Sequence, residues 1–180
     1  MFNLKKSQEK QYSILINNRE IAISQSQIEK LIKNKLQNDF AVVKMFKKFD
    51  LSLQQLDNLK IQIEPLQDRY AETDADKMVL STSLFDNHHD EDWFDKNYFI
   101  ICHEILHFIY RNYERKAGYF GDHEEIDGFV LSIASLLSQN KSVDEIYNKI
   151  FPKIEFHFHD PQKAKVFFST LIVKAKEFLM

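Results

Sequence analysis

The pentad His103-Glu104-Ile105-Leu106-His107 is the part of this sequence whose residue types and spacing most directly suggest chemistry. Residues four apart on a helix lie on one face, so the imidazoles of His103 and His107 are able to meet a single tetrahedral Zn²⁺. The glutamate after the first histidine points to the adjacent side of the helix, where it reaches a zinc-bound water without binding the metal. Zinc lowers the pKa of that water towards ~7, and Glu104 then takes its proton as a general base. The pentad therefore predicts hydrolysis at a zinc ion.

The neighbours of the pentad favour a metal site over two unrelated surface histidines. Residues 99–102 and 108–110 are almost entirely apolar, so the helix that carries the pentad is expected to be largely buried. Burying two imidazoles without partners would be costly. A shared metal ion removes that cost, and we therefore expect His103 and His107 to be zinc ligands.

A catalytic zinc ion needs a third protein ligand and an open fourth position. The third ligand is expected from another element, and the cluster 122–127 follows a glycine-containing break that lets the chain fold back. His123 is the first choice, because it shares a helix face with the apolar stripe that should point at the pentad. Glu125 and then Glu124 are the alternatives, although both would also be favourable simply as charges at a helix N-terminus. Asp127 is a candidate to accept the other N–H of a zinc-bound histidine.

The remaining histidines and the single cysteine are expected to lie outside the site. His88 and His89 stand in an acidic loop and are expected at the surface. His157 and His159 alternate with phenylalanines, as on the solvent face of a strand. Cys102 points away from the histidine face of its helix and is expected to be a small buried hydrophobic residue.

Length and composition indicate a soluble protein of one domain. The chain has 180 residues, of which 44% are hydrophobic, and a formal net charge of -3. This charge provides no global attraction to nucleic acid or to an acidic membrane. One cysteine excludes an intrachain disulfide, the polar start of the chain does not resemble a signal peptide, and no apolar run has membrane-spanning length. We therefore expect a cytoplasmic protein with neither a nucleic-acid nor a membrane partner.

The spacing of apolar residues predicts an α+β fold that is mostly helical and contains a small antiparallel sheet. Alternation over 12–24 predicts a hairpin, and further strands are expected at 59–64 and 77–84, joined by a polar segment 67–76. Helical spacing predicts helices over 26–49, 50–56, 93–114, 122–139, 142–150 and from 161 onward. Asp122 and Glu125 form a capping-box-like start for one of them. A short extended piece is expected at 156–159.

Together with these residues, the stretch from about 78 to 137 resembles the core of the zincin metallopeptidases. That family places an edge strand before the HExxH helix and takes the last zinc ligand from a second helix. The segment 78–84 is similar to that edge strand, which in the family binds the substrate backbone as an added β-strand. SprT-like peptidases have a histidine as their third ligand. ImmA/M48-type peptidases carry a Glu-x-x-x-Asp/Asn pattern, which matches His123 to Asp127 with histidine at the glutamate position. Both alignments select His123.

The resemblance implies a zinc metallopeptidase that hydrolyses a protein or peptide substrate in extended conformation. Its zinc ligands would be His103, His107 and His123, and its catalytic base Glu104. Tyr119 is a candidate to stabilise the oxyanion. The alternative is a non-catalytic zincin-fold regulatory or protein-binding module with a structural or vestigial metal site, against which the intact Glu104 argues.

We interpret residues 1–180 as a single domain with three parts. A zincin-like core covers 61–140, a hairpin and helical addition covers 1–60, and a helical segment covers 141–180. The N-terminal part is a candidate cover for the cleft, in which case its deletion would raise activity. The substrate, the cleavage site and the oligomeric state stay open.

Overall fold

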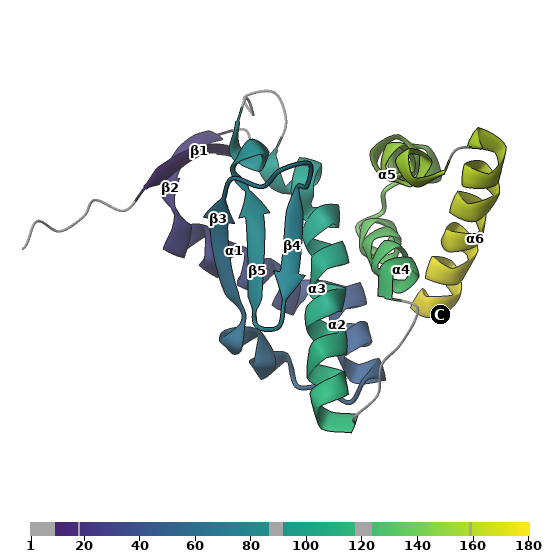
Figure 1. Cartoon of the computed structure of the whole chain (residues 1–180), viewed down its shortest axis with the longest axis horizontal. Helices are drawn as coiled ribbons and strands as arrows, with labels where there is room; N and C mark the ends of the chain where they lie inside the picture. Colours follow the sequence, from purple (N-terminus) through teal and green to yellow (C-terminus); the bar gives the residue numbers. More distant parts are fainter. Residues whose placement is uncertain (1–9, 18, 87–91, 118–123, 159) are drawn as a thin grey trace, which may run out of the picture.

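The structure is a computed structural model that describes residues 10–17, 19–86, 92–117, 124–158 and 160–180, without the side chains of 114–117 and 157. Helices dominate these ranges, together with a two-stranded antiparallel sheet and a mixed three-stranded sheet (Figure 1). The predicted α+β, mostly helical fold class is confirmed.

An N-terminal hairpin begins the described chain, as the alternating pattern predicts. Strand β1 (Gln11–Ile16) pairs antiparallel with β2 (Arg19–Ser24). Tyr12 packs its ring 4.9 Å from that of Phe85, which in turn stacks on Trp93 at 5.2 Å. The backbone N–H of Asn17 donates to Asp92 at 2.7 Å. These contacts attach the hairpin to the start of the helix that carries the pentad.

Two helices follow the hairpin and form one wall of the core. Helix α1 (Gln25–Asn38) begins at a capping box between Ser24 and Gln27, and α2 (Phe40–Lys48) begins where Asp39 accepts the N–H of Val42. Their buried apolar residues belong to the same cluster as those of the site helices: Ile28, Ile32, Leu36, Ala41, Val42, Met45 and Phe46. This packing makes the segment a part of the core, so its deletion is expected to unfold the protein rather than uncover a cleft.

The three-stranded sheet has the order β3-β5-β4. A 3₁₀ turn, η1 (Leu53–Asn58), leads into β3 (Lys60–Glu64), which pairs parallel with β5 (Lys77–Ser81). Strand β4 (Ala71–Asp74) pairs antiparallel with β5 and forms the end of the sheet. The segment 77–84 is therefore the central strand followed by a second 3₁₀ turn, η2 (Thr82–Phe85), and its expected edge position is wrong. The two edge strands are β3 and β4, and β4 lies in the segment that was expected to be only a polar connection.

Helices α3 (Trp93–Ala117) and α4 (Glu124–Ser138) pack antiparallel and carry the candidate site. Asp92 starts α3 by accepting the N–H of Phe94 at 2.9 Å. Figure 1 shows α3 beside the β4 edge of the sheet, with α1 and α2 behind it, and α4 on its other side. Small residues let the two helices approach closely, since Gly128, Ser132 and Ser135 are all buried on α4. The expected Asp122 cap lies outside the described residues.

Two C-terminal helices pack on α4. Helix α5 (Val143–His157) runs through Pro152, and α6 (Pro161–Leu179) starts at Asp160, which accepts the N–H groups of Gln162 and Lys163. The expected end at 150 and the extended piece at 156–159 are wrong for residues up to 157. Burial of Phe151 and Ile154 keeps the chain helical past the proline, at the loss of one backbone hydrogen bond.

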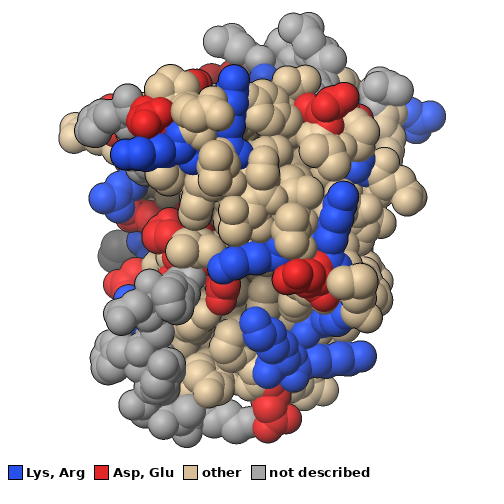
Figure 2. All heavy atoms as spheres, turned by 90° about the vertical axis from the view of Figure 1, so that its right-hand side faces the viewer, with Lys and Arg blue, Asp and Glu red and all other residues tan. Residues whose placement is uncertain are grey.

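The outer side of α5 and α6 is mixed in character (Figure 2). Basic and acidic side chains are interspersed there among uncharged ones. A shallow hollow on α6 is lined by Gln162, Lys165, Val166, Ser169, Thr170 and Val173. None of the helices in the described ranges has the length and apolarity needed to cross a membrane.

Candidate metal centre

Helix α3 holds the two histidines of the pentad on one face, as their spacing predicts. The ring centroids of His103 and His107 lie 5.4 Å apart, and each side chain is 16% exposed. The residues around them are fully buried, among them Ile105, Leu106 and Phe108. The helix is thus fixed in the core on its other sides, and its histidine face borders α4.

Helix α4 brings a carboxylate to that face. Nε2 of His103 lies 3.1 Å from Oε2 of Glu125, and Nε2 of His107 lies 3.6 Å from Oε1 of the same carboxylate. One ligand atom from each of the three residues lies within 4.8 Å of the others. Two imidazole nitrogens and one carboxylate oxygen therefore converge at one point between the helices.

This donor set fits a catalytic zinc ion. Two histidines with one glutamate are a common catalytic set, and ligand atoms on one tetrahedral zinc lie roughly 3.3 Å apart. The observed group needs only small movements to reach that spacing, because the Glu125 side chain is 74% exposed and able to turn. His103, His107 and Glu125 are the described residues that would hold the metal.

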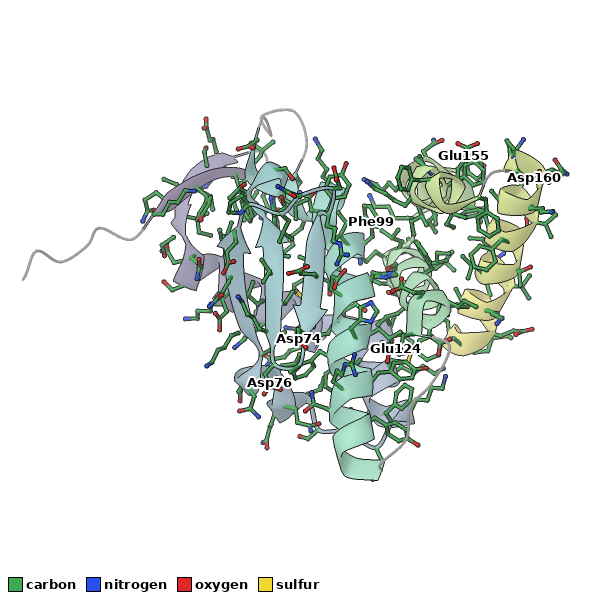
Figure 3. All side chains as sticks on the ribbon, in the orientation of Figure 1. Asp74, Asp76, Phe99, Glu124, Glu155 and Asp160 are labelled. Atoms are coloured by element: carbon green, nitrogen blue, oxygen red, sulfur yellow. The ribbon has the colours of Figure 1, made fainter. Side chains whose placement is uncertain are left out.

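Glu124 fixes the orientation of the second histidine. Its Oε2 accepts the Nδ1–H of His107 at 3.0 Å. A proton on Nδ1 leaves Nε2 with its lone pair free for a metal, which is the usual role of such a partner. Figure 3 labels Glu124 at the start of α4, across α3 from Asp74 on the edge strand. Glu124 thus makes the contact with a histidine ring that the sequence suggested for Asp127, while Asp127 accepts a hydrogen bond from the hydroxyl of Tyr110 at 2.6 Å.

Glu104 is a buried carboxyl beside this cluster, with 8% of its surface exposed. Burial raises its pKa above the usual range, while the charges of His103 and His107 act in the opposite direction. The hydroxyl of Thr73 on β4 faces the same carboxyl and also lowers its pKa. Among the described residues Thr73 Oγ1 has no hydrogen-bond partner of good geometry. A carboxylate with a raised pKa is a stronger proton acceptor near neutral pH.

Several expected positions fall outside the described residues. His123, the first choice for the third ligand, is one of them, as are Tyr119, His88, His89 and His159 and the side chain of His157. The assignment of His123 therefore stays a prediction, and the structure places the second choice, Glu125, at the site. Cys102 is fully buried, as expected, and burial raises the pKa of its thiol.

Two contributors to the site were not predicted from the sequence. Strand β4, which carries Thr73, is short and mostly polar, and only Ala71 on it is buried. It therefore lacks the apolar alternation that predicts a strand. Gly128 lies inside α4, and a Cβ there would sit 2.7 Å from Nδ1 of His103. A glycine at an interior helical position is a signal of close approach, but which group approaches depends on how the helices pack.

Comparison with known proteins leaves the site without a relative to assign it. No protein-family profile, no curated protein and no solved structure matches the chain.

Proposed function

We propose that the protein is a zinc-dependent peptidase of the zincin type. The observation that carries the proposal is the convergence of His103, His107 and Glu125 within 4.8 Å, next to the buried Glu104. A site that is only structural encloses its metal with four protein ligands, whereas a catalytic site keeps a position open. The three described donors, one of them on a mostly exposed side chain, are in keeping with the second type.

The residues of the chain divide the work of peptide hydrolysis. His103 and His107 would hold zinc through Nε2, and Glu125 or the predicted His123 would complete the set. A bound zinc ion supplies activation of a water molecule and polarisation of the scissile carbonyl. Glu104 takes a proton from the attacking water at its carboxylate and delivers it to the leaving amine. Glu124 keeps His107 in the tautomer that exposes Nε2.

The substrate is proposed to be a protein segment in extended conformation. Strand β4 ends the sheet and carries Thr73, which faces Glu104 from the sheet side. An added strand along that edge would place backbone amides near the catalytic carboxyl, with main-chain hydrogen bonds supplying affinity. Lys153 of α5 lies over the ring of Tyr70 at 3.5 Å, just before β4 begins. Helix α5 therefore lies near the start of the β4 edge, and the β4–β5 turn lies at the other end of that edge.

Metal analysis of the purified protein beside its Glu104→Gln variant tests the proposal. We expect about one zinc per chain in both proteins, because Glu104 is not a ligand. Cleavage of an unstructured protein such as casein should be lost only in the variant, by about 10²–10⁴-fold, the usual contribution of a general base. The non-catalytic alternative, in which the metal site is structural or vestigial, predicts no difference in cleavage between the two proteins. A His103→Ala variant that still binds one zinc would contradict the assigned site.

A further inference from the structure

Gly128 occupies an interior position of α4 where glycine is unfavourable. A glycine inside a helix costs roughly 0.5–1 kcal/mol relative to alanine, because it loses more backbone freedom on folding. The position is also fully covered by neighbouring atoms, since Gly128 is buried. A buried helical site would ordinarily favour alanine, so the glycine needs a specific reason.

The reason is the imidazole of His103. A Cβ on residue 128 would lie 2.7 Å from Nδ1, 2.8 Å from Cε1 and 3.1 Å from Cγ of that ring. Carbon and nitrogen atoms without a bond between them do not approach to these distances at acceptable energy. The ring of His103 therefore rests directly on the backbone of α4, and one added methyl group would have to move either the ring or the helix.

Neither the ring nor the helix has much freedom to move. The ring of Phe129 lies 4.9 Å from that of His103, and the ring of His107 lies 5.4 Å away. One turn further along α4, the hydroxyl of Ser132 lies 2.8 Å from the carbonyl oxygen of Phe99 and 2.9 Å from that of Gly128. Figure 3 labels Phe99 on α3, one turn before His103. This bond fastens the two helices together next to the contact.

We infer that Gly128 is a positioning residue of the metal centre, and this inference rests on the proposed zinc site. Its missing side chain lets α4 support the ring of His103 at Nδ1, so that Nε2 points toward Glu125. A side chain at this position displaces Nε2 from the point where the ligand atoms meet. Gly128 touches no metal or substrate itself and acts only through His103.

Gly128→Ala in the full chain tests this inference, with zinc affinity and thermal unfolding as readouts. We expect the variant to bind zinc about 10–100-fold more weakly, the usual result of disturbing the support of a ligand. The melting temperature without zinc should also fall. In a His103→Ala background the obstacle is gone, and Gly128→Ala should then raise the melting temperature by about 2–4 °C through helix propensity alone.

Ala134→Gly is the matched control, because Ala134 is also buried on α4 and the same two residue types are exchanged. It should lower the melting temperature and leave zinc affinity unchanged, which separates loss of stability from loss of ligand position. Unchanged zinc affinity in Gly128→Ala, or the same shift in melting temperature with and without His103, would overturn the inference. If the parent protein binds no zinc, the proposed function is refuted. The melting-temperature shifts of Gly128→Ala with and without His103 would then still show whether a side chain at position 128 collides with the His103 ring.

Discussion

Helix α4 carries two polar clusters, and they differ in whether their polar atoms are accessible to a ligand. Near its N-terminus, Glu124 and Glu125 meet the histidines of α3 at a surface that is partly open. Seven residues beyond Gly128, Ser135 is fully buried and donates to Oδ2 of Asp39 at 2.6 Å. The first cluster joins α3 to α4 and the second joins the start of α2 to α4, but only the first directs several ligand atoms at one point.

The buried cluster is satisfied by its own members. Oδ1 of Asp39 accepts the N–H of Val42 at 3.0 Å, so both carboxylate oxygens have donors. Gln139 donates to Ser135 Oγ at 3.0 Å. Cys102 lies beside this cluster, where burial and the carboxylate of Asp39 raise the pKa of its thiol. The carboxylate of Asp39 and the hydroxyl of Ser135 are thus paired within the protein, which stabilises one packing of the helices.

The two clusters differ in burial, and burial separates a cluster that only holds the fold from one that is accessible to a ligand. The histidine cluster includes a glutamate that is 74% exposed, and its Nε2 atoms face that side chain. In the second cluster, Asp39 is 8% exposed and Ser135 is fully buried. Substitutions in the first cluster should therefore change metal binding at little cost in stability, and substitutions in the second should do the opposite.

The largest effect on metal binding is expected from Glu125→Ala. Zinc sites in proteins have binding free energies of ~10–16 kcal/mol, to which each ligand contributes a share. Removal of one of three protein ligands should therefore weaken zinc binding by about 3–4 kcal/mol, or several hundred-fold. Glu124→Ala is the matched control, because it removes only the acceptor at His107 Nδ1. We expect about a tenfold loss there. Competition with a chromogenic chelator measures both affinities.

Glu125→Ala compared with His123→Ala settles the third ligand. An affinity that stays within tenfold of the parent in Glu125→Ala, together with loss of zinc in His123→Ala, would assign the position to His123. Thermal unfolding without zinc should be nearly unchanged in Glu125→Ala, because the side chain is mostly exposed.

Asp39→Ala should give the largest loss of stability. The substitution removes the cap of α2, worth ~1 kcal/mol, and leaves the Ser135 hydroxyl without its acceptor, worth a further ~1–3 kcal/mol. Asp160→Ala is the matched control, since Asp160 caps α6 without such a buried donor, and should cost only ~1 kcal/mol. Urea unfolding measures both free energies. Zinc affinity that falls in Asp39→Ala as strongly as in Glu125→Ala would break the contrast between the clusters.

The smallest effect is a pH dependence located at Glu104. Burial raises the pKa of this carboxyl in the folded state above its ordinary value of 4.5, so the folded protein holds the proton more tightly than the unfolded chain. The contribution of Glu104 to the stability of the folded state is therefore most favourable below pH 4.5, the ordinary pKa, and is lost as the pH rises through the pKa of the folded state. Without zinc, the melting temperature of Glu104→Gln should exceed that of the parent by an amount that grows over this range. A constant difference would contradict the raised pKa.

The elements that follow from local rules could be predicted from the sequence. The hairpin, α1, α2, α3, α4 and α6 follow from periodicity and from caps such as Ser24 and Asp160, because these depend on neighbours in the chain. The histidine face of α3 is local in the same sense, since four residues make about one helical turn. This is why the pentad alone places His103 and His107 together.

Other features depend on contacts between distant segments, which only the tertiary structure decides. Strand β4 forms because β5 offers it a partner, and α5 passes Pro152 because buried residues on both sides of it hold the helix in place. The roles of Glu124 and Glu125 depend on how α4 is rotated against α3. The sequence by its helical spacing set two imidazoles on one face of α3 with a glutamate beside them. The close packing of α3 on α4, which Gly128 permits, decided which carboxylate meets that pair and which one supports it.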